Sequence, residues 1–394
     1  MQVYLDYNAT TPVDPEVLRA MLPYFEDRFA NASSIHRKGQ EARHAVEEAR
    51  ELIADSLRVE PGDIIFTSGG TEADNLALKG MMAWLGEKRP HMVVSTIEHQ
   101  AVLHVAQFLE KTGLKVTYVP TDSKGIVDLE RLKKAVTDKT ALVSLMHVNN
   151  ELGTIQPIQE AAKIAHAKGA YFHTDAVQSF GKLDLDAEAE GADLISVSAH
   201  KICGPKGAGA LYVKKGLRIQ AVTHGGHQEK NIRPGTENVP AIVGFGKAVQ
   251  LAGKFRHAES ERVKALRDKL EHGILEKIPD SEINGDIQKR IYSTSNVSFK
   301  GLDGETLLIN LDLKGICVST GSACTAGSVE PSHVLLALGL EEKIARSAVR
   351  FSLGRFTVEK EIDTVLAELP EAIEKLRKSS TERTVKPATH SKLP

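Results

Sequence analysis

The sequence predicts an α/β protein, with a mostly parallel sheet of seven strands followed by a smaller α/β unit. Short β-branched runs alternate with segments of helical periodicity, as in consecutive βαβ units. Most of these runs are apolar throughout, which is typical of strands covered on both faces. The runs begin at Ile64, Met92, Val116, Ala141, Ala170, Leu194 and Gly209.

The elements follow from local patterns along the chain. Residues 36–58 form an expected amphipathic helix, because their apolar side chains recur at helical spacing. The last strand, "GALYV", follows "LISVSA" too closely for a crossover helix, which needs about a dozen residues. We therefore expect "GALYV" to pair antiparallel with a neighbour in the sheet.

A long, increasingly charged helical pattern from 239 to 278 connects the sheet to the second unit. Strand and helix patterns alternate again after it, ending in a helix from about 358 to 377. We predict a large domain over 14–254 and a small domain formed by 1–13 and 255–378. Residues 379–394 are polar and without periodicity, which predicts a disordered tail.

The composition excludes several function classes. The chain has 394 residues and a net charge of −2, so no nucleic-acid or anionic-membrane partner is expected. Three cysteines without a CxxC pair argue against a disulfide framework and a zinc ribbon. The first residues lack the pattern of a signal peptide, and no apolar run approaches the length of a membrane span. The prediction is a cytoplasmic protein.

Three strand ends carry polar side chains. The first strand ends in Ser68-Gly69-Gly70, and Thr71 is the expected cap of the next helix. Amide groups at such a helix start favour a phosphate, although a plain tight turn is an equal alternative. Asp175 ends the strand "YFHTD", where open α/β sheets bind ligands, or it caps the next helix.

The third strand end carries Lys201, in "SAHKICGPKGAGALYV". A lysine in a sheet crevice has a lowered pKa and can act as an amine nucleophile, whereas most lysines are solvated at the surface. An anion cradle, a buried Asp and a strand-end Lys in one sheet match the needs of pyridoxal phosphate. The cofactor requires a phosphate site, a pyridinium partner and a Schiff-base lysine.

The chain resembles a fold-type I pyridoxal-phosphate transferase, specifically a cysteine desulfurase of the NifS/IscS group. The resemblance runs from about residue 3 to 356 and is carried by "HTDAVQ", "SAHK", "RPGTENVP", "VRFSLGR" and "GSACTAGS". It implies that Lys201 forms the Schiff base, that Asp175 pairs with the pyridine nitrogen and that Gln178 hydrogen-bonds the phenolate oxygen. It implies further roles for the phosphate-binding residues Gly70, Thr71, Ser198 and His200, for the ring-stacking acid/base His99, and for Asn150 and Arg350, which hold the substrate carboxylate.

The resemblance also implies a homodimer, in which Thr236 binds the phosphate across the subunit boundary. It assigns Cys324 as the nucleophile that takes sulfur from L-cysteine as a persulfide and releases L-alanine. "STGSACTAGSVE" has no apolar periodicity, so a mobile loop is expected around this cysteine. An iron–sulfur scaffold or another thiolation partner would receive the sulfur, with Cys324 as a candidate ligand of a transient [2Fe–2S] cluster.

Two rival functions stay open at the level of sequence. Another pyridoxal enzyme, such as an aminotransferase or selenocysteine lyase, would share most of the site, but an aminotransferase has no use for Cys324. A non-catalytic cluster scaffold would use the three cysteines and would lack the yellow cofactor. Two departures from the family pattern stand out, Ala32 in place of a proline and Cys203 two residues after Lys201.

Overall fold

A computed structural model of the chain describes residues 2–320 and 330–385, with side chains to 378. All seven predicted strands of the large sheet are confirmed. They lie in the order β2-β8-β7-β6-β5-β3-β4, and β8 runs antiparallel to both of its neighbours, as expected. Their bounds are β2 Ile64–Thr67, β3 His91–Ser95, β4 Lys115–Val119, β5 Thr140–Ser144, β6 Tyr171–Asp175, β7 Leu194–Ser198 and β8 Gly209–Val213.

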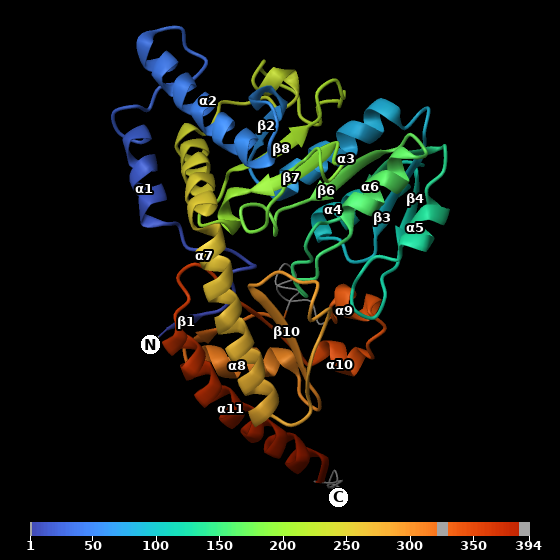
Figure 1. Cartoon of the computed structure of the whole chain (residues 1–394), viewed down its shortest axis with the longest axis vertical. Helices are drawn as coiled ribbons and strands as arrows, with labels where there is room; N and C mark the ends of the chain where they lie inside the picture. Colours follow the sequence, from blue (N-terminus) through green and yellow to red (C-terminus); the bar gives the residue numbers. More distant parts are fainter. Residues whose placement is uncertain (1, 321–329, 386–394) are drawn as a thin grey trace, which may run out of the picture.

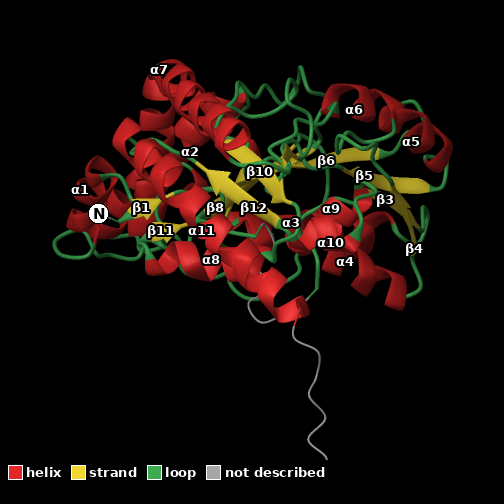
Figure 2. Cartoon of the chain, turned by 90° about the horizontal axis from the view of Figure 1, so that it is seen from below, coloured by secondary structure: helices red, strands yellow, loops and turns green. Residues whose placement is uncertain are grey.

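Helices cover both faces of this sheet (Figure 2). Alternate residues of one strand enter different cores, since Ile64 and Phe66 pack in one apolar cluster and Ile65 in another. This period of two is expected of a strand buried on both faces. One face carries α2 Arg37–Leu57, α5 Leu129–Ala135, α6 Ile158–His166 and part of α7 Val239–Lys277, and the other carries α3 Gly70–Leu85 and α4 Gln100–Lys111.

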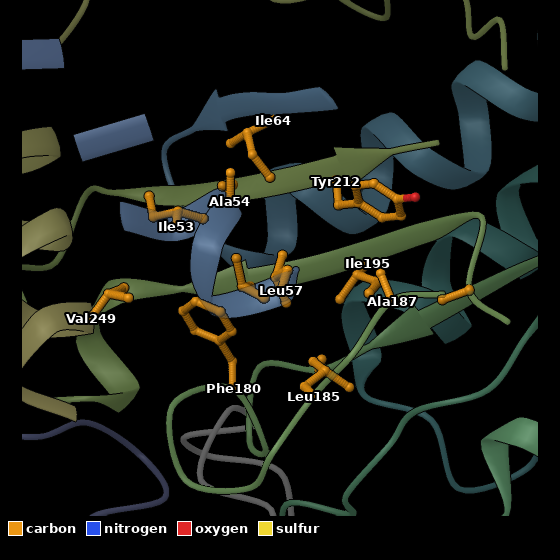
Figure 3. Close-up of a cluster of buried hydrophobic side chains, with 14 of the residues drawn as sticks. Ile53, Ala54, Leu57, Ile64, Phe180, Leu185, Ala187, Ile195, Tyr212 and Val249 are labelled. Carbon is orange, nitrogen blue, oxygen red and sulfur yellow. The ribbon is translucent and has the colours of Figure 1, made fainter. Parts of the chain in front are cut away.

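Helix α2 confirms the helix predicted over 36–58. Its apolar stripe reaches Ile53 and Leu57, which lie over the sheet residues Ile64 and Ile195 (Figure 3). Arg58 ends the helix in a left-handed conformation with φ of 57°. The short helix α1 Pro15–Met21 precedes α2 and packs on α7.

The second unit has two small sheets below the large one (Figure 1). β12 Ala348–Ser352, β10 Thr294–Phe299 and β9 Ser281–Ile283 form an antiparallel sheet in that order. The amino-terminal strand β1 Val3–Tyr4 pairs in parallel with β11 Ile316–Cys317. Its helices are α8 Gly304–Leu313, α9 His333–Ala337, α10 Glu342–Arg346 and α11 Glu359–Val385.

The 39-residue helix α7 runs continuously from the large sheet into the second unit. The domain division at 254 therefore falls inside a helix, and we retain it as a proposal. Helix α11 also continues past position 378 to Val385, so the backbone there is helical where a disordered tail was expected. No strong helix breaker occurs in this stretch before Pro387. Within the part of the chain that the structure describes, no helix combines the length and apolar character that crossing a bilayer requires.

A buried ion pair fixes the long loop after β8. Arg50 Nη2 lies 2.7 Å from Glu229 Oε1, and the other carboxylate oxygen accepts hydrogen bonds from Arg50 Nη1 and from the amide of Phe66. Glu229 and the next two residues are left-handed, with φ of 41°, 59° and 64°. Such a run of left-handed residues persists only when its surroundings hold it, and the buried Glu229 side chain supplies that hold.

Candidate active site

A cavity of about 340 Å³ lies where the carboxyl ends of the large-sheet strands face the second unit. Its wall brings together residues that are up to 342 positions apart in the chain. The predicted site residues in the wall are Gly70, Thr71, His99, Asn150, Asp175, Gln178, His200, Lys201 and Arg350. The wall also includes Asn8, Ala9, Asp74, Met146, Val148 and Val177, which the sequence did not single out as site residues.

The start of α3 forms an anion cradle beside this cavity. The helix begins at Gly70 with Gly69 as its N-cap, so the predicted cap at Thr71 is wrong. Gly69 has φ of 154° and ψ of −177°, a conformation that glycine alone tolerates, and this lets the helix begin two residues earlier than predicted. Ser198 is buried nearby, and its Oγ has no hydrogen-bond partner among the described residues.

Asp175 is 6% exposed at the end of β6, and its Oδ1 accepts a hydrogen bond from the amide of Val177 at 2.9 Å. The segment that follows is a turn, not a helix, so the capping alternative does not apply. Burial raises the pKa of Asp175 to about 6, and the ammonium of Lys201 opposes that rise. A cationic ring nitrogen placed against it would favour the carboxylate further.

Lys201 follows β7 through a single turn of 3-10 helix, Ala199–Lys201. Its Nζ donates hydrogen bonds to the backbone carbonyls of Asn8 and of Ala9, the latter at 2.8 Å. Gln178 Nε2 donates to the same Asn8 carbonyl at 2.9 Å. One backbone carbonyl of the amino-terminal segment, that of Asn8, therefore accepts hydrogen bonds from both Lys201 and Gln178.

His99 is the N-cap of α4, and its Nδ1 accepts a hydrogen bond from the amide of Ala101 at 3.1 Å. Burial and the nearby charge of Lys201 lower the pKa of His99 to about 4. The imidazole is therefore neutral near pH 7. Because Nδ1 accepts, the ring proton is on Nε2, which makes Nε2 a donor.

Arg350 projects from β12 and is 2% exposed. Its Nη2 lies 2.7 Å from Asp6 Oδ1, and its Nη1 donates to the backbone carbonyl of Asn150 at 3.0 Å. Burial with an acidic partner keeps the guanidinium fixed at the cavity wall. A planar, fixed guanidinium is suited to binding a carboxylate through two hydrogen bonds.

Among the described residues, Thr236 does not line the cavity of its own subunit. Thr236 lies in the loop after β8, beside Arg233, whose Nε is 2.7 Å from Glu72 in the first turn of α3. Cys324 lies outside the described residues. Cys203 is buried behind Lys201, and burial raises the pKa of its thiol to about 11, as expected of a packed, unreactive cysteine.

Comparison with known proteins identifies the family. The class-V aminotransferase family pattern matches residues 3–365. The chain belongs to this family. It is 49% identical to the cysteine desulfurase IscS of Clostridium botulinum over 96% of each chain. Two solved structures are each 39% identical to the chain in sequence. A NifS-like protein matches with a TM-score of 0.90, over 95% of this chain and 100% of that one. SspA in complex with cysteine matches with a TM-score of 0.81, over 90% of this chain and 100% of that one.

Within this family the chain belongs to the NifS/IscS group of cysteine desulfurases, and its activity is cysteine desulfuration. The predicted resemblance and the α/β fold class are both confirmed. Class-V membership also implies pyridoxal phosphate. The chain's residues fit that cofactor, because the unsatisfied Ser198 hydroxyl adjoins the α3 amino terminus while Asp175 and Lys201 line the adjoining cavity.

Two buried carboxyl groups near the cavity escaped the sequence analysis as site residues. Asp74 is 1% exposed near the start of α3, with its Oδ1 3.6 Å from His173 Nε2, and burial together with Asp175 raises its pKa. Glu98 is fully buried beside His99, where its Oε1 accepts from Ser95 Oγ at 2.5 Å and from the amide of Met146 at 2.9 Å. In the sequence each of them is followed by a polar residue, Asn75 or His99, so no local pattern indicated burial.

The buried carboxyl group of Glu98 leads to a testable prediction about stability. Burial raises the pKa of Glu98 from 4.5 to about 8, so the native protein keeps a proton that the unfolded chain releases. The stabilisation from this group is fully present below pH 4.5 and is lost as the pH rises to about 8. Glu98→Gln should therefore stabilise the protein more at pH 8 than at pH 5, by up to roughly 4 kcal/mol.

Urea unfolding of the wild type and Glu98→Gln at both pH values measures this difference. Glu51→Gln, on the exposed face of α2, is the control and should behave alike at both. If Glu98→Gln changed stability equally at pH 5 and pH 8, the carboxyl group would not be protonated in the native state.

Proposed function

We propose that the cavity binds L-cysteine through Arg350 and converts it to L-alanine, with the sulfur passing to Cys324. The convergence of Lys201, Asp175 and the anion cradle on one cavity carries this proposal. Pyridoxal phosphate, when bound there, supplies an electron sink that weakens the Cα–H and Cβ–S bonds of an amino acid. The cysteine ligand of the related SspA structure supports the same substrate class.

The roles of the protein groups follow from their positions. Arg350 holds the substrate carboxylate, beside Asn150, while the neutral His99 presents its Nε2–H as a hydrogen-bond donor. Lys201 Nζ accepts the Cα proton, because it is the amine nearest the cofactor cradle. Asp175 holds the ring nitrogen in its protonated form, which maintains the electron sink.

Cys324 completes the transfer in this proposal. Its thiolate forms an S–S bond with the substrate sulfur, the Cβ–S bond breaks, and Cβ takes a proton. The balance is L-cysteine and a thiol giving L-alanine and a persulfide. We propose that the persulfide supplies an iron–sulfur scaffold or another thiolation partner, and that Cys324 is a candidate ligand of the [2Fe–2S] cluster then formed.

The segment that carries Cys324 is anchored on both sides next to the cavity. Ser319 exchanges backbone hydrogen bonds with Arg350, and after the segment Ser332 Oγ donates to Glu151 at 2.5 Å. Four residues separate Thr320 from Cys324 in the sequence, a length of chain that spans at most about 14 Å when fully extended. A tether of that length supports delivery of the thiol to the site.

We also propose that each site is completed by a second copy of the chain, through Thr236. The ion pairs of Glu229 with Arg50 and of Arg233 with Glu72 hold its loop close to the α3 amino terminus. Thr236 is exposed and stays out of the cavity wall of its own subunit. A phosphate contact across a two-fold interface would explain a rigid, exposed threonine here.

The first prediction concerns the two lysines of "HKICGPK". Lys201→Ala should abolish alanine formation and the yellow colour, because it removes the amine that binds the cofactor and moves the proton. Lys206→Ala should leave both intact, since Lys206 is exposed and outside the cavity wall. Alanine release and the visible spectrum measure the two effects. Full activity in Lys201→Ala would overturn the assignment.

The second prediction separates the two thiols. Cys324→Ala should keep the cofactor spectrum and respond spectrally to cysteine, but form almost no alanine and retain no radiolabelled sulfur. Cys203→Ala should lose about 1 kcal/mol of stability through a small cavity and keep most of the activity. An inactive Cys203→Ala together with an active Cys324→Ala would place the sulfur acceptor beside Lys201 instead.

The third prediction tests the dimer by complementation. Thr236→Ala should weaken cofactor binding, and Lys201→Ala should be inactive. A mixed dimer of the two has one site with both groups intact if Thr236 acts across the interface. Mixing and re-dimerising the two variants should therefore restore alanine formation above either parent at limiting cofactor. No gain from mixing, or a fully active monomer by light scattering, would refute the shared site.

A further inference from the structure

A second lysine, Lys182, contacts the side chain of Gln178 in the proposed cofactor site. Lys182 lies in the turn after β6, and its Nζ donates to Gln178 Oε1 at 3.3 Å. Lys182 also lines a second cavity of about 20 Å³, which it shares with Lys201, Cys203 and Glu259. That volume holds about one water molecule. The resemblance and the proposed mechanism leave this lysine without a role.

The contacts of Gln178 allow only one of the two possible orientations of its side-chain amide. The ammonium of Lys182 has only donors, so the carbonyl oxygen of the amide must face it. The backbone carbonyl of Asn8 only accepts, so Nε2 must face that group, at 2.9 Å. A flipped amide would set N–H groups against the ammonium and two oxygens against each other. The second Nε2–H is therefore the group that Gln178 offers to the cavity.

Several charged groups act on Lys182. Glu259 on α7 and the Cys203 sulfur favour its charged form, whereas Arg350 on β12 and burial oppose it, and burial lowers its pKa to about 8. The ammonium form therefore predominates at pH 7. A cationic donor on the carbonyl oxygen polarises an amide and makes its N–H a stronger donor.

We propose that Lys182 is a positioning residue, which fixes the Gln178 amide as a hydrogen-bond donor toward the phenolate oxygen of the cofactor. The inference rests on the proposed function and on the family resemblance, which implies a hydrogen bond from Gln178 to that oxygen. A donor at this oxygen favours the deprotonated cofactor. Lys182 thereby lowers the pKa of the bound cofactor without touching it.

The test is a pH titration of the visible absorption band in the loaded protein. Lys182→Met should raise the pKa of that band by roughly 0.5 to 1 unit, and Lys182→Arg, which keeps a cationic donor, should restore most of the shift. The matched control is Lys163→Met, because Lys163 makes the same contact with Gln159, four residues earlier, on the exposed face of α6. That variant should leave the titration unchanged.

A double-mutant cycle separates positioning from a direct charge effect. In a Gln178→Ala background, Lys182→Met should cause no further shift if Lys182 acts through the amide. An equal shift in both backgrounds would mean that the ammonium acts through space, and no shift in either would also overturn the proposal. Should Lys182→Met fail to fold by circular dichroism, Lys182→Leu, which also lacks a donor, should give the same shift. A wild-type protein without the visible band would refute the cofactor site itself, which is a separate outcome.

Discussion

One backbone carbonyl, that of Asn8, holds the active site together. It accepts hydrogen bonds from both Lys201 and Gln178, while the Asn8 side chain donates to Asn150 and to Thr294 at 3.0 and 2.9 Å. These partners come from the large sheet, its connecting loops and the small sheet. The backbone carbonyls of Asn8 and Ala9 orient the Lys201 amine at the cavity wall. The chemistry of the cavity depends on this arrangement.

Burial, more than charge pairing, sets the protonation of the site. His99, His147 and His200 all have a pKa lowered to about 4, chiefly by burial, and Glu98 keeps its proton for the same reason. The two histidines that line the described cavity wall, His99 and His200, are therefore neutral near pH 7. In such surroundings each hydrogen bond to a ligand is stronger than it would be in water.

The sequence predicted those site residues whose position follows from a local pattern of strand, turn and helix. Asp175 and Lys201 stand at strand ends, and the strands themselves follow from apolar runs. Asn8 and Lys182 were missed because their roles arise from contacts between segments far apart in the chain or from the orientation of a turn. The start of α3 was misplaced by two residues, because the amino-acid sequence does not reveal the backbone conformation of Gly69.

The pairing of β1 imposes an order on biosynthesis. Val3 lies beside Ile316, and Asp6 beside Ser352, so the first strand has no partner until almost the whole polypeptide has been made. At ordinary translation speeds of about 5 to 20 residues per second, the amino terminus waits roughly 20 to 70 s for that partner. Asn8 belongs to this waiting segment. A ribosome-bound nascent chain can therefore assemble its large sheet before the segment with the Asn8 carbonyl, which orients Lys201, is fixed in place. The active site is then completed only near the end of synthesis.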